Sequence, residues 1–492
     1  MLDRKQFLTG LGALGAAGIA SRRAAAQTQE GITAEVADFV VGTRFETLPP
    51  ELIELSRKHI LDCFGLALAG EKAETGPIVR RYLGEMGAGA GAATVLGTNL
   101  RAPPRFAAFA NGVAIHADDY DDTQLAVAKD RVYGLLTHPS VTALPASLAM
   151  AEAGGKSGRD FLVAYHLAVE IETKVAEASN PRAYDGGFHS TGLFGVFGAT
   201  VGAAKIRGLD AKQIRNALGI AGGEASGVRE NFGTMTKPFQ AGHAAEGGVM
   251  AADLAAIGWT AAENILEAQR GIWAAAGGGF DRGAIAGKLG KPWSLLNPGV
   301  SIKPYPSGSL THPAMDEMGR LVKANRLKAD DIASIRVGAS KPMLNTLIQH
   351  HPKTGLEGKF SMEYCMAVLV TEGKAGLGEF TDEAVNRPGV QALLKRVDFY
   401  NNPAADAAGT DKMRSLIEVH MEDGRVINGA VVDYARGSPQ IPMSFNDEKD
   451  KFLDCAAYAG LPAANAQAII AAVEGLEKLT DIRGLTRLLA RA

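Results

Sequence analysis

The sequence predicts a mainly α-helical protein: one large all-helical domain with a smaller α+β domain inserted before its final helices. Three observations support this fold class. Apolar residues recur at spacings of three and four over roughly the first 300 residues, which is typical of amphipathic helices. Strand-like alternation is confined to the segment that follows, and the end of the chain is again helical in pattern. With 492 residues, the chain is long enough for a large core and an inserted domain.

Residues 1–27 have the features of an export signal. Arg4-Lys5 precedes Gln6-Phe7-Leu8 and resembles a twin-arginine signal with lysine in the second place. The apolar stretch 8–20 is too short and too rich in glycine to span a bilayer stably, and Ala24-x-Ala26 supplies a cleavage site. We therefore expect a periplasmic protein cleaved near Ala26, exported by the twin-arginine or the Sec route. A disordered or helical extension is the alternative.

Residues 31–298 form the first part of the predicted helical domain. Helical spacing is clear in Pro49–Ala69, Phe161–Ala178 and Ala211–Ile220. Few runs in this part alternate with period two, so a large parallel sheet is not expected. Residues 437–492 are helical in pattern and are expected to return the chain to this domain.

Residues 299–436 form the predicted α+β domain. Ser334–Ala339 and Ile417–Met421 alternate as strands do. The turn Asp423-Gly424 then leads to a partner strand, Arg425–Asp433, which predicts a hairpin. Two helices are expected beside the strands: His312–Ala324 and Phe360–Thr371.

Composition and missing motifs exclude several function classes. The net charge of −3 provides no basic field for nucleic acid or an anionic membrane. The three cysteines, Cys63, Cys365 and Cys455, lie in mostly apolar sequence, which favours buried, inert thiols over disulfides or a zinc site. The sequence has no GxGxxG after a strand, no GxxxxGKS/T, no HExxH and no GxSxG. This argues against nucleotide, dinucleotide, metalloprotease and serine hydrolase chemistry.

The densest polar cluster runs from His116 to Thr123 and contains four aspartates, Asp118, Asp119, Asp121 and Asp122. These groups cannot all be buried, and their repulsion requires neighbours that hydrogen-bond or neutralise them. Three interpretations stay open: a solvated acidic loop, a Mg²⁺ or Ca²⁺ site, and one wall of an active site. The glycine and glutamate of a calcium loop are missing from their places.

Two histidines and two lysines stand in similar contexts downstream. His138 precedes a predicted helix, Val141–Ala153, and His189 precedes Gly195–Ala204, so both lie where helix N-termini favour anions. Lys237 leads into a third predicted helix, Ala244–Ala255. Each of these groups, taken alone, is more often a capping, packing or solvated residue.

Lys237 and Lys303 each stand before a proline, and His312 opens a predicted helix after Lys303. Because proline partly fixes the backbone, such a lysine loses less freedom when it binds a carboxylate. Four cationic or titratable residues, each expected just before a helix, predict a shared anion site.

These residues carry a resemblance to the MmgE/PrpD family, which includes 2-methylcitrate dehydratases and cis-aconitate decarboxylases. The resemblance covers about residues 31–492 and rests on ordered landmarks. They are Asn111-Gly112 to His116, Asp119 to Thr123, Thr137 to Ser140, the His189 turn, Lys237-Pro238 with Gly242, Lys303 to Pro306, Phe360-Ser361 with Tyr364, and Asn386 to Pro388.

The resemblance implies a helical body, a smaller α+β lid, and a homodimer with the active site between body and lid. It also implies activity on a small polycarboxylate without metal or organic cofactor. Residues that match positions implicated in the family's active site are Asp119, Thr123, His138, His189, Lys237 and Lys303. One departure is Gly308, which stands where decarboxylase-like members place a histidine, and His312 lies four residues later.

The resulting hypothesis is a cofactor-independent lyase, of the dehydratase or hydratase type, for a di- or tricarboxylate such as a 2-methylcitrate-like compound. His138 and His189 would transfer protons. Substrate carboxylates would bind Lys237, Lys303 and His312, while Asp119 and Thr123 orient a histidine or a substrate hydroxyl. The alternatives are an epimerase or isomerase of an amino- or imino-dicarboxylate, and a non-catalytic exported carboxylate-binding protein.

Overall fold

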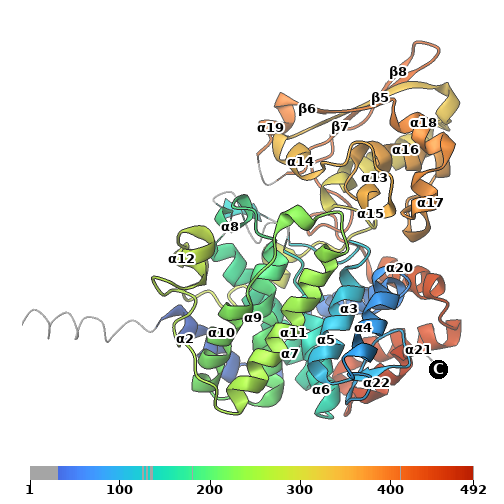
Figure 1. Cartoon of the computed structure of the whole chain (residues 1–492). Helices are drawn as coiled ribbons and strands as arrows, with labels where there is room; N and C mark the ends of the chain where they lie inside the picture. Colours follow the sequence, from blue (N-terminus) through green and yellow to red (C-terminus); the bar gives the residue numbers. More distant parts are fainter. Residues whose placement is uncertain are drawn as a thin grey trace, which may run out of the picture.

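The computed structural model describes residues 31–124, 127–128, 131–132, 137–179, 181–409 and 412–490; the predicted signal, residues 1–27, lies outside them. The protein is mainly helical, as predicted, with a large helical body and a smaller unit that contains a four-stranded sheet (Figure 1). Among the helices of the described ranges, none combines the length and apolar character needed to cross a membrane.

The helices of the body follow closely from the apolar periodicity. The predicted helices Pro49–Ala69, Phe161–Ala178 and Ala211–Ile220 occur as α3, α7 and α10. The body contains α2 (Ile32–Gly42), α3 (Pro50–Gly70), α4 (Thr75–Glu85), α5 (Pro104–His116), α6 (Ser140–Ala153), α7 (Gly158–Ser179), α8 (Arg182–Asp185), α9 (Ser190–Arg207), α10 (Ala211–Glu224), α11 (Thr236–Ala256) and α12 (Ile272–Gly277). Two short antiparallel pairs accompany them, β1 (Ala93–Thr94) with β2 (Arg101–Ala102) and β3 (Val127–Ala128) with β4 (Arg131–Val132).

Small residues let α5, α9 and α11 approach closely at the centre of the body. A methyl group at Gly248 of α11 would lie 2.4 Å from the Cβ of Ala199 in α9. One at Gly112 of α5 would lie 2.9 Å from the Cα of Gly242 in α11. Because a close-packed interior leaves no room for either methyl, glycine is required at both crossings. This packing brings the end of α5 next to the beginnings of α6, α9 and α11.

The smaller unit, called the lid below, is built on a mixed sheet with strand order β6-β5-β7-β8. The strands are β5 (Ile332–Ala339), β6 (Val397–Asn401), β7 (Leu416–Met421) and β8 (Val426–Asn428). The predicted hairpin is present, with Gly424 in the left-handed region at φ 85°. Its second strand is shorter than the predicted Arg425–Asp433. The sequence analysis did not identify β6, which pairs in parallel with β5.

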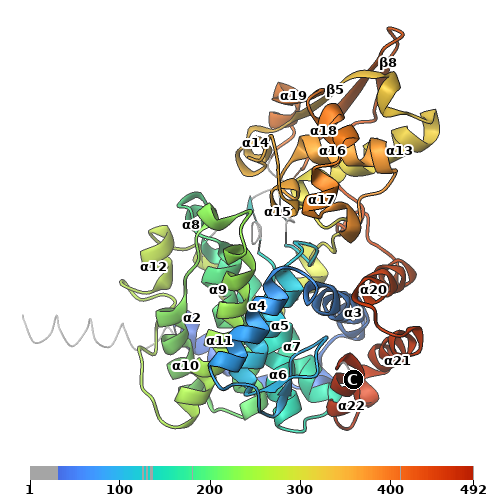
Figure 2. The same ribbon diagram turned by 45° about the vertical axis from the view of Figure 1, so that its right-hand side comes forward.

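Helices fill the space between this sheet and the body (Figures 1 and 2). The two predicted ones occur as α13 (His312–Asn325) and α16 (Met362–Glu372), and with β5 and β7 they form a second hydrophobic core. The remaining lid helices are α14 (Lys341–Thr346), α15 (Gly355–Gly358), α17 (Asp382–Val385), α18 (Pro388–Leu394) and α19 (Pro403–Asp406).

The last three helices return to the body, where α20 and α21 pack beside α3 and α22 packs against α21 (Figure 2). They are α20 (Phe445–Ala459), α21 (Ala463–Glu474) and α22 (Arg483–Leu489). Ser444 caps α20, because its hydroxyl accepts a hydrogen bond from the backbone N–H of Asp447 at 3.1 Å. Phe452 and Cys455 of α20 belong to the same core as α2 and α3, so the body is closed by residues that lie on both sides of the lid in the sequence.

Two expectations about the lysines are wrong. Helix α11 begins at Thr236 rather than near Ala244, so Lys237 lies in its first turn, where the following proline is tolerated because first-turn N–H groups need no partner inside the helix. Lys303 does not directly precede a helix; an irregular loop and the 3₁₀ turn Ser309–Thr311 separate it from α13.

Candidate active site

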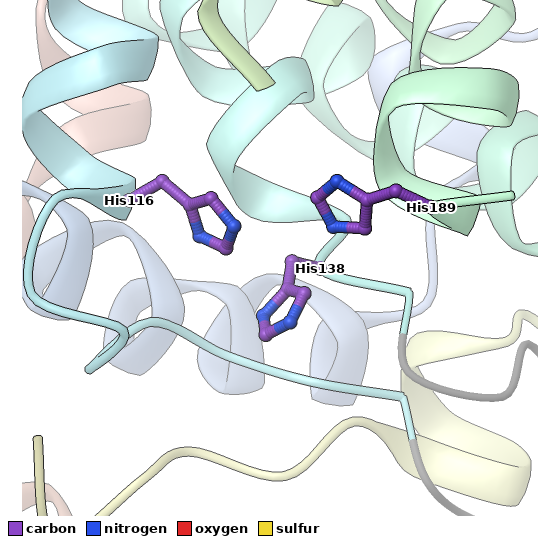
Figure 3. A group of neighbouring side chains, drawn as sticks. All are labelled: His116, His138 and His189. Atoms are coloured by element: carbon purple, nitrogen blue, oxygen red, sulfur yellow. The ribbon is translucent and has the colours of Figure 1, made fainter. Parts of the chain in front are cut away.

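Four helix ends converge on one buried site in the body. His116 is the last residue of α5, His138 stands two residues before α6, and His189 is the N-cap of α9. Their imidazole rings point toward one another (Figure 3). The ring centroid of His116 lies 4.7 Å from that of His138 and 5.8 Å from that of His189. Lys237, from the first turn of α11, contacts the same cluster.

The carboxylate of Asp119 binds two buried ammonium groups. Its Oδ1 lies 2.5 Å from Nζ of Lys237 and 3.1 Å from Nζ of Lys303. Lys303 also donates to the backbone carbonyl of Asp119 at 2.9 Å. Burial opposes ionisation of Asp119, but the positive charges of Lys237 and Lys303 hold its pKa well below the usual value. Both lysines are therefore part of a buried ion cluster and are not solvated.

Asp121 orients two of the histidines. Its carboxylate oxygens lie 2.9 Å from Nδ1 of His116 and 2.9 Å from Nδ1 of His138. Burial would raise the pKa of Asp121, but the two imidazoles hold it well below its usual value. The ionised carboxylate accepts from Nδ1 of His116, and the backbone carbonyl of Asp122 accepts from Nδ1 of His138 at 3.0 Å, so both Nδ1 atoms carry the proton. The Nε2 atom of each ring is left with its lone pair.

His189 has the same tautomer for a different reason. The side-chain amide of Gln240 donates through Nε2 to the carbonyl of Val228 at 3.0 Å, so its Oε1 faces His189 Nδ1 at 2.6 Å and accepts from it. The Nε2 of His189 is buried and has no hydrogen-bond partner within the described part of the chain. Burial, followed by the charge of Lys237, lowers the pKa of His189 well below its usual value.

The remaining two histidines of the cluster are also bases at neutral pH. Burial lowers the pKa of His116 to about 4, against the opposing charge of Asp121. It lowers the pKa of His138 as well. Nζ of Lys237 lies 3.0 Å from Nε2 of His116 and donates to its lone pair. Among the described residues, the ring of His138 has hydrogen-bond partners only at Nδ1, which Thr123 Oγ1 also approaches at 3.1 Å. Its Nε2 is thus available to a substrate.

A small pocket lies beside these groups, between body and lid. The body contributes its charged and titratable lining. The lid contributes mostly apolar atoms and no charged side chain, and the rings of Phe232 and Phe360 stack across the boundary at 5.9 Å. The lining residues are Asp119, Thr123, His138, Phe232, Lys237, Lys303, Gly308, Ser309, Leu310, Thr346, Leu347 and Phe360. Such a pocket places the anionic part of a ligand against the body and its hydrocarbon part against the lid.

The lid is tied to the body at the rim of the pocket. Lys359, just after α15, is buried and donates to the backbone carbonyl of Asp118 at 2.8 Å; its Nζ also lies 3.2 Å from Asp118 Oδ1. Asp118 is partly exposed, whereas the other three aspartates of the cluster are buried. Asp122 turns away from the pocket and binds His59 at 2.7 Å. The cluster is therefore an internal scaffold and not a solvated acidic loop.

The structure brings most of the predicted site residues together. Asp119, Thr123, His138, Lys237 and Lys303 line the pocket, and His189 adjoins it. His312 does not reach the lining; its Nε2 lies 3.1 Å from the carbonyl of Ser307 and supports the loop. His116, Asp121 and Gln240 were not predicted as site residues. Each lies within one of the sequence landmarks. The spacing of residues in the sequence does not show, however, that Asp121 and Gln240 orient histidine rings.

Gly308 lies in the lid wall of the pocket. A Cβ atom there would meet Leu347 at 3.4 Å and Phe360 at 3.5 Å, which are ordinary contacts. An alanine would therefore fit, while a larger side chain would occupy pocket volume. The absence of a side chain at this position leaves that volume to the ligand.

Two groups of side chains have donor atoms close enough to hold a metal ion. They are His116 with His138 and His189, and His116 with Asp119, Asp121 and His138. Neutral imidazoles are suitable ligands. However, the ammonium of Lys237 already binds Nε2 of His116. The Nδ1 atoms of His116 and His138 both contact the carboxylate of Asp121. A bound cation would have to displace Lys237, so the residues present do not fit a resident metal.

Two regions of the chain match known domains. Residues 34–283 match the MmgE/PrpD N-terminal domain, and residues 305–478 match the MmgE/PrpD C-terminal domain. Human cis-aconitate decarboxylase is 28% identical over 470 residues, covering 94% of this chain and 95% of the relative. The mouse enzyme of the same name is 29% identical over 472 residues, covering 94% and 93%. The 2-methylcitrate dehydratase of Cupriavidus necator is 25% identical over 441 residues, covering 82% and 85%.

The histidine environment predicts a pH dependence. His138 is a base only above its pKa, which lies below 6.5, so the acid limb of kcat/KM is expected below pH 6.5. Asp121→Asn removes the charge that stabilises the imidazolium form, so the pKa falls further and the limb moves to lower pH. The measurement is the pH profile of kcat/KM together with an ¹⁵N NMR titration of His138. Asp398→Asn, on the exposed edge strand β6, is the matched control; a limb that stays in place or moves to higher pH contradicts the assigned contact.

Proposed function

The chain belongs to the MmgE/PrpD family, and from this premise we propose that it is a lyase acting on a small tricarboxylate, with histidine as acid and base and without metal or organic cofactor. Dehydration, or hydration in reverse, is the reaction we put forward. One observation supports this most strongly: two ammonium groups and the neutral imidazole of His138 line one pocket, and two further neutral imidazoles lie against that of His138.

The site can supply each part of an elimination. A substrate carboxylate would bind between Lys237 and Lys303, sharing them with Asp119. When a proton leaves the carbon beside that carboxylate, the charge that develops is enolate-like, and the fixed ammonium groups stabilise it. Nε2 of His189 or His138 takes the proton. The carbon–oxygen bond then breaks, and the imidazolium protonates the departing hydroxide, which releases water and restores the neutral histidine.

Decarboxylation is the second candidate, because the human and mouse cis-aconitate decarboxylases match at higher identity and coverage than the 2-methylcitrate dehydratase of Cupriavidus necator. The apolar lid wall also suits it, since a carboxylate that becomes CO₂ loses its charge. Gly308, in place of the histidine that the resemblance leads one to expect in decarboxylase-like members, counts against it. Both reactions require stabilisation of negative charge beside a retained carboxylate.

Turnover of a panel of carboxylates distinguishes the reactions. We expect the purified protein in D₂O to convert citrate or 2-methylcitrate into an alkene with loss of water, as followed by proton NMR, and to do so equally after EDTA treatment. Release of CO₂ from cis-aconitate would instead establish the decarboxylase. Hydrogen exchange without elimination would indicate an isomerase, and binding without either reaction a binding protein. Loss of activity on chelation, restored by one metal, would contradict cofactor independence.

The two lysines should govern affinity. Lys237→Met or Lys303→Met removes one charge-assisted hydrogen bond to a carboxylate, which contributes about 1.5–3 kcal/mol, so affinity should fall roughly ten- to a hundredfold. Calorimetry with citrate measures this. Lys374→Met, an exposed lysine of the lid, is the control. If both site variants remain folded and bind as the wild type does, the lysines do not hold the substrate.

Export to the periplasm and assembly into a homodimer are further proposals, supported by the signal-like residues 1–27 and by the family resemblance. Mature protein from a periplasmic fraction should begin close to Gln27, and sedimentation should give twice the mass of the chain. An intact Met1 on protein from its native host would contradict export. A monomer at micromolar concentration would contradict the dimer.

A further inference from the structure

We propose that Lys451, on the C-terminal helix α20, is a positioning residue that holds together the two loops that carry Asp119 and Lys303. Its Nζ donates to the carbonyl of Tyr120 at 2.9 Å and to the carbonyl of Lys303 at 2.8 Å. It also lies 2.6 Å from Oδ1 of Asp62 in α3. The ammonium group thus donates to one carbonyl from each loop and forms an ion pair with α3.

Both carbonyls belong to the site itself. Tyr120 directly follows Asp119, and the second carbonyl is that of the lysine whose ammonium binds Asp119. Lys451 thus fixes the backbone of Lys303 while Asp119 fixes its side chain. The Lys451 ammonium also lies 3.8 Å from the centroid of the Tyr120 ring, a distance at which the ring face attracts a cation.

Other contacts between the two loops show that their relative position is specified closely. The hydroxyl of Tyr120 donates to the carbonyl of Pro304 at 3.2 Å. The backbones of Thr123 and Ser301 exchange two hydrogen bonds of 2.8 Å. Asp119 itself has a φ of 49°, a conformation that costs free energy for a residue other than glycine and persists only where its surroundings impose it. Through Lys451, helix α20 contributes to fixing the relative position of the two loops.

The charge of Lys451 is balanced inside the protein. Burial opposes the charged form, but Asp62 and Glu448 hold the pKa of Lys451 above its usual value. Burial raises the pKa of Asp62 to about 6 and that of Glu448 to about 8. Because Lys451 donates to a carbonyl in each loop and does not line the pocket, it acts through the two loops and not on a substrate. The alternative is that it only stabilises the packing of α20 on α3.

Three variants separate these roles. Lys451→Met combined with Asp62→Asn removes the donors without leaving an unpaired buried carboxylate. Lys451→Arg retains a charged donor that can reach both carbonyls. Lys449→Met is the matched control, because this lysine of the same helix pairs with Glu474 at 2.6 Å on the surface and touches neither loop.

Hydrogen exchange of the backbone amides in 117–124 and 300–308 is the first readout, and the ¹⁵N signals of His116 and His138 are the second. In the double variant we expect at least tenfold faster exchange in both loops and shifted imidazole signals, with partial recovery in Lys451→Arg and no change in Lys449→Met. Wild-type exchange and signals in a folded double variant overturn the proposal, as does the same effect from Lys449→Met.

Turnover is the third readout and rests on the proposed function. The double variant should lose kcat by about 10- to 100-fold at a temperature where it is folded, because small misplacements of site groups have effects of this size. The first two readouts need no substrate. If the wild type converts no carboxylate, the proposed lyase function is wrong, but hydrogen exchange and the ¹⁵N signals still test the positioning role of Lys451. If the double variant does not fold, Lys451→Gln with Asp62→Asn, which keeps a neutral polar pair between α20 and α3 but removes the ammonium group, should still accelerate exchange in both loops; wild-type exchange there overturns the proposal.

Discussion

The ion cluster in which one carboxylate, Asp119, binds two buried lysines is the interaction on which the site depends. Neither Lys237 nor Lys303 could stay charged in the interior without a partner, because the loss of hydration costs several kcal/mol per ion. Asp119 binds both ammonium groups directly, and the ionised Asp121 beside the histidines balances the second positive charge. The carboxylate of Asp119 joins α11 to the loop that leads into the lid.

The position of the lid in the sequence follows from this cluster. The chain leaves the body through the loop that carries Lys303 and returns just before α20. These two connections lie side by side, because the N–H of Ile302 donates to the carbonyl of Gly437 at 2.9 Å. Helix α20 then brings Lys451 back to the carbonyl of Lys303. Because the lid is inserted at this point, the continuous segment from Lys303 to α20 supplies the Lys303 ammonium, the lid wall of the pocket and, through Lys451, the support for the Lys303 loop.

The periodicity of the sequence predicted the fold class because burial of one helix face follows directly from the spacing of apolar residues. The predicted positions of Asp119, His138, Lys237 and Lys303 came from landmarks that resemble a family, and the structure brings these residues together. Contacts between distant segments leave no such signal: Lys451 is separated from Tyr120 by 331 positions. His312 illustrates the reverse problem, because its spacing from Lys303 did not show which way its ring points.

The tautomers of the three histidines constrain the chemistry further. Asp121, the carbonyl of Asp122 and Gln240 place the proton on Nδ1 of His116, His138 and His189, so the resting site presents lone pairs and no imidazolium. A reaction that begins with proton abstraction, such as dehydration or epimerisation, can use this state directly and obtains its acid from the substrate's own proton. Decarboxylation begins with loss of CO₂ and needs a donor for the carbanion. It would therefore depend on a proton taken up together with the polyanionic substrate, whose charge favours the imidazolium form.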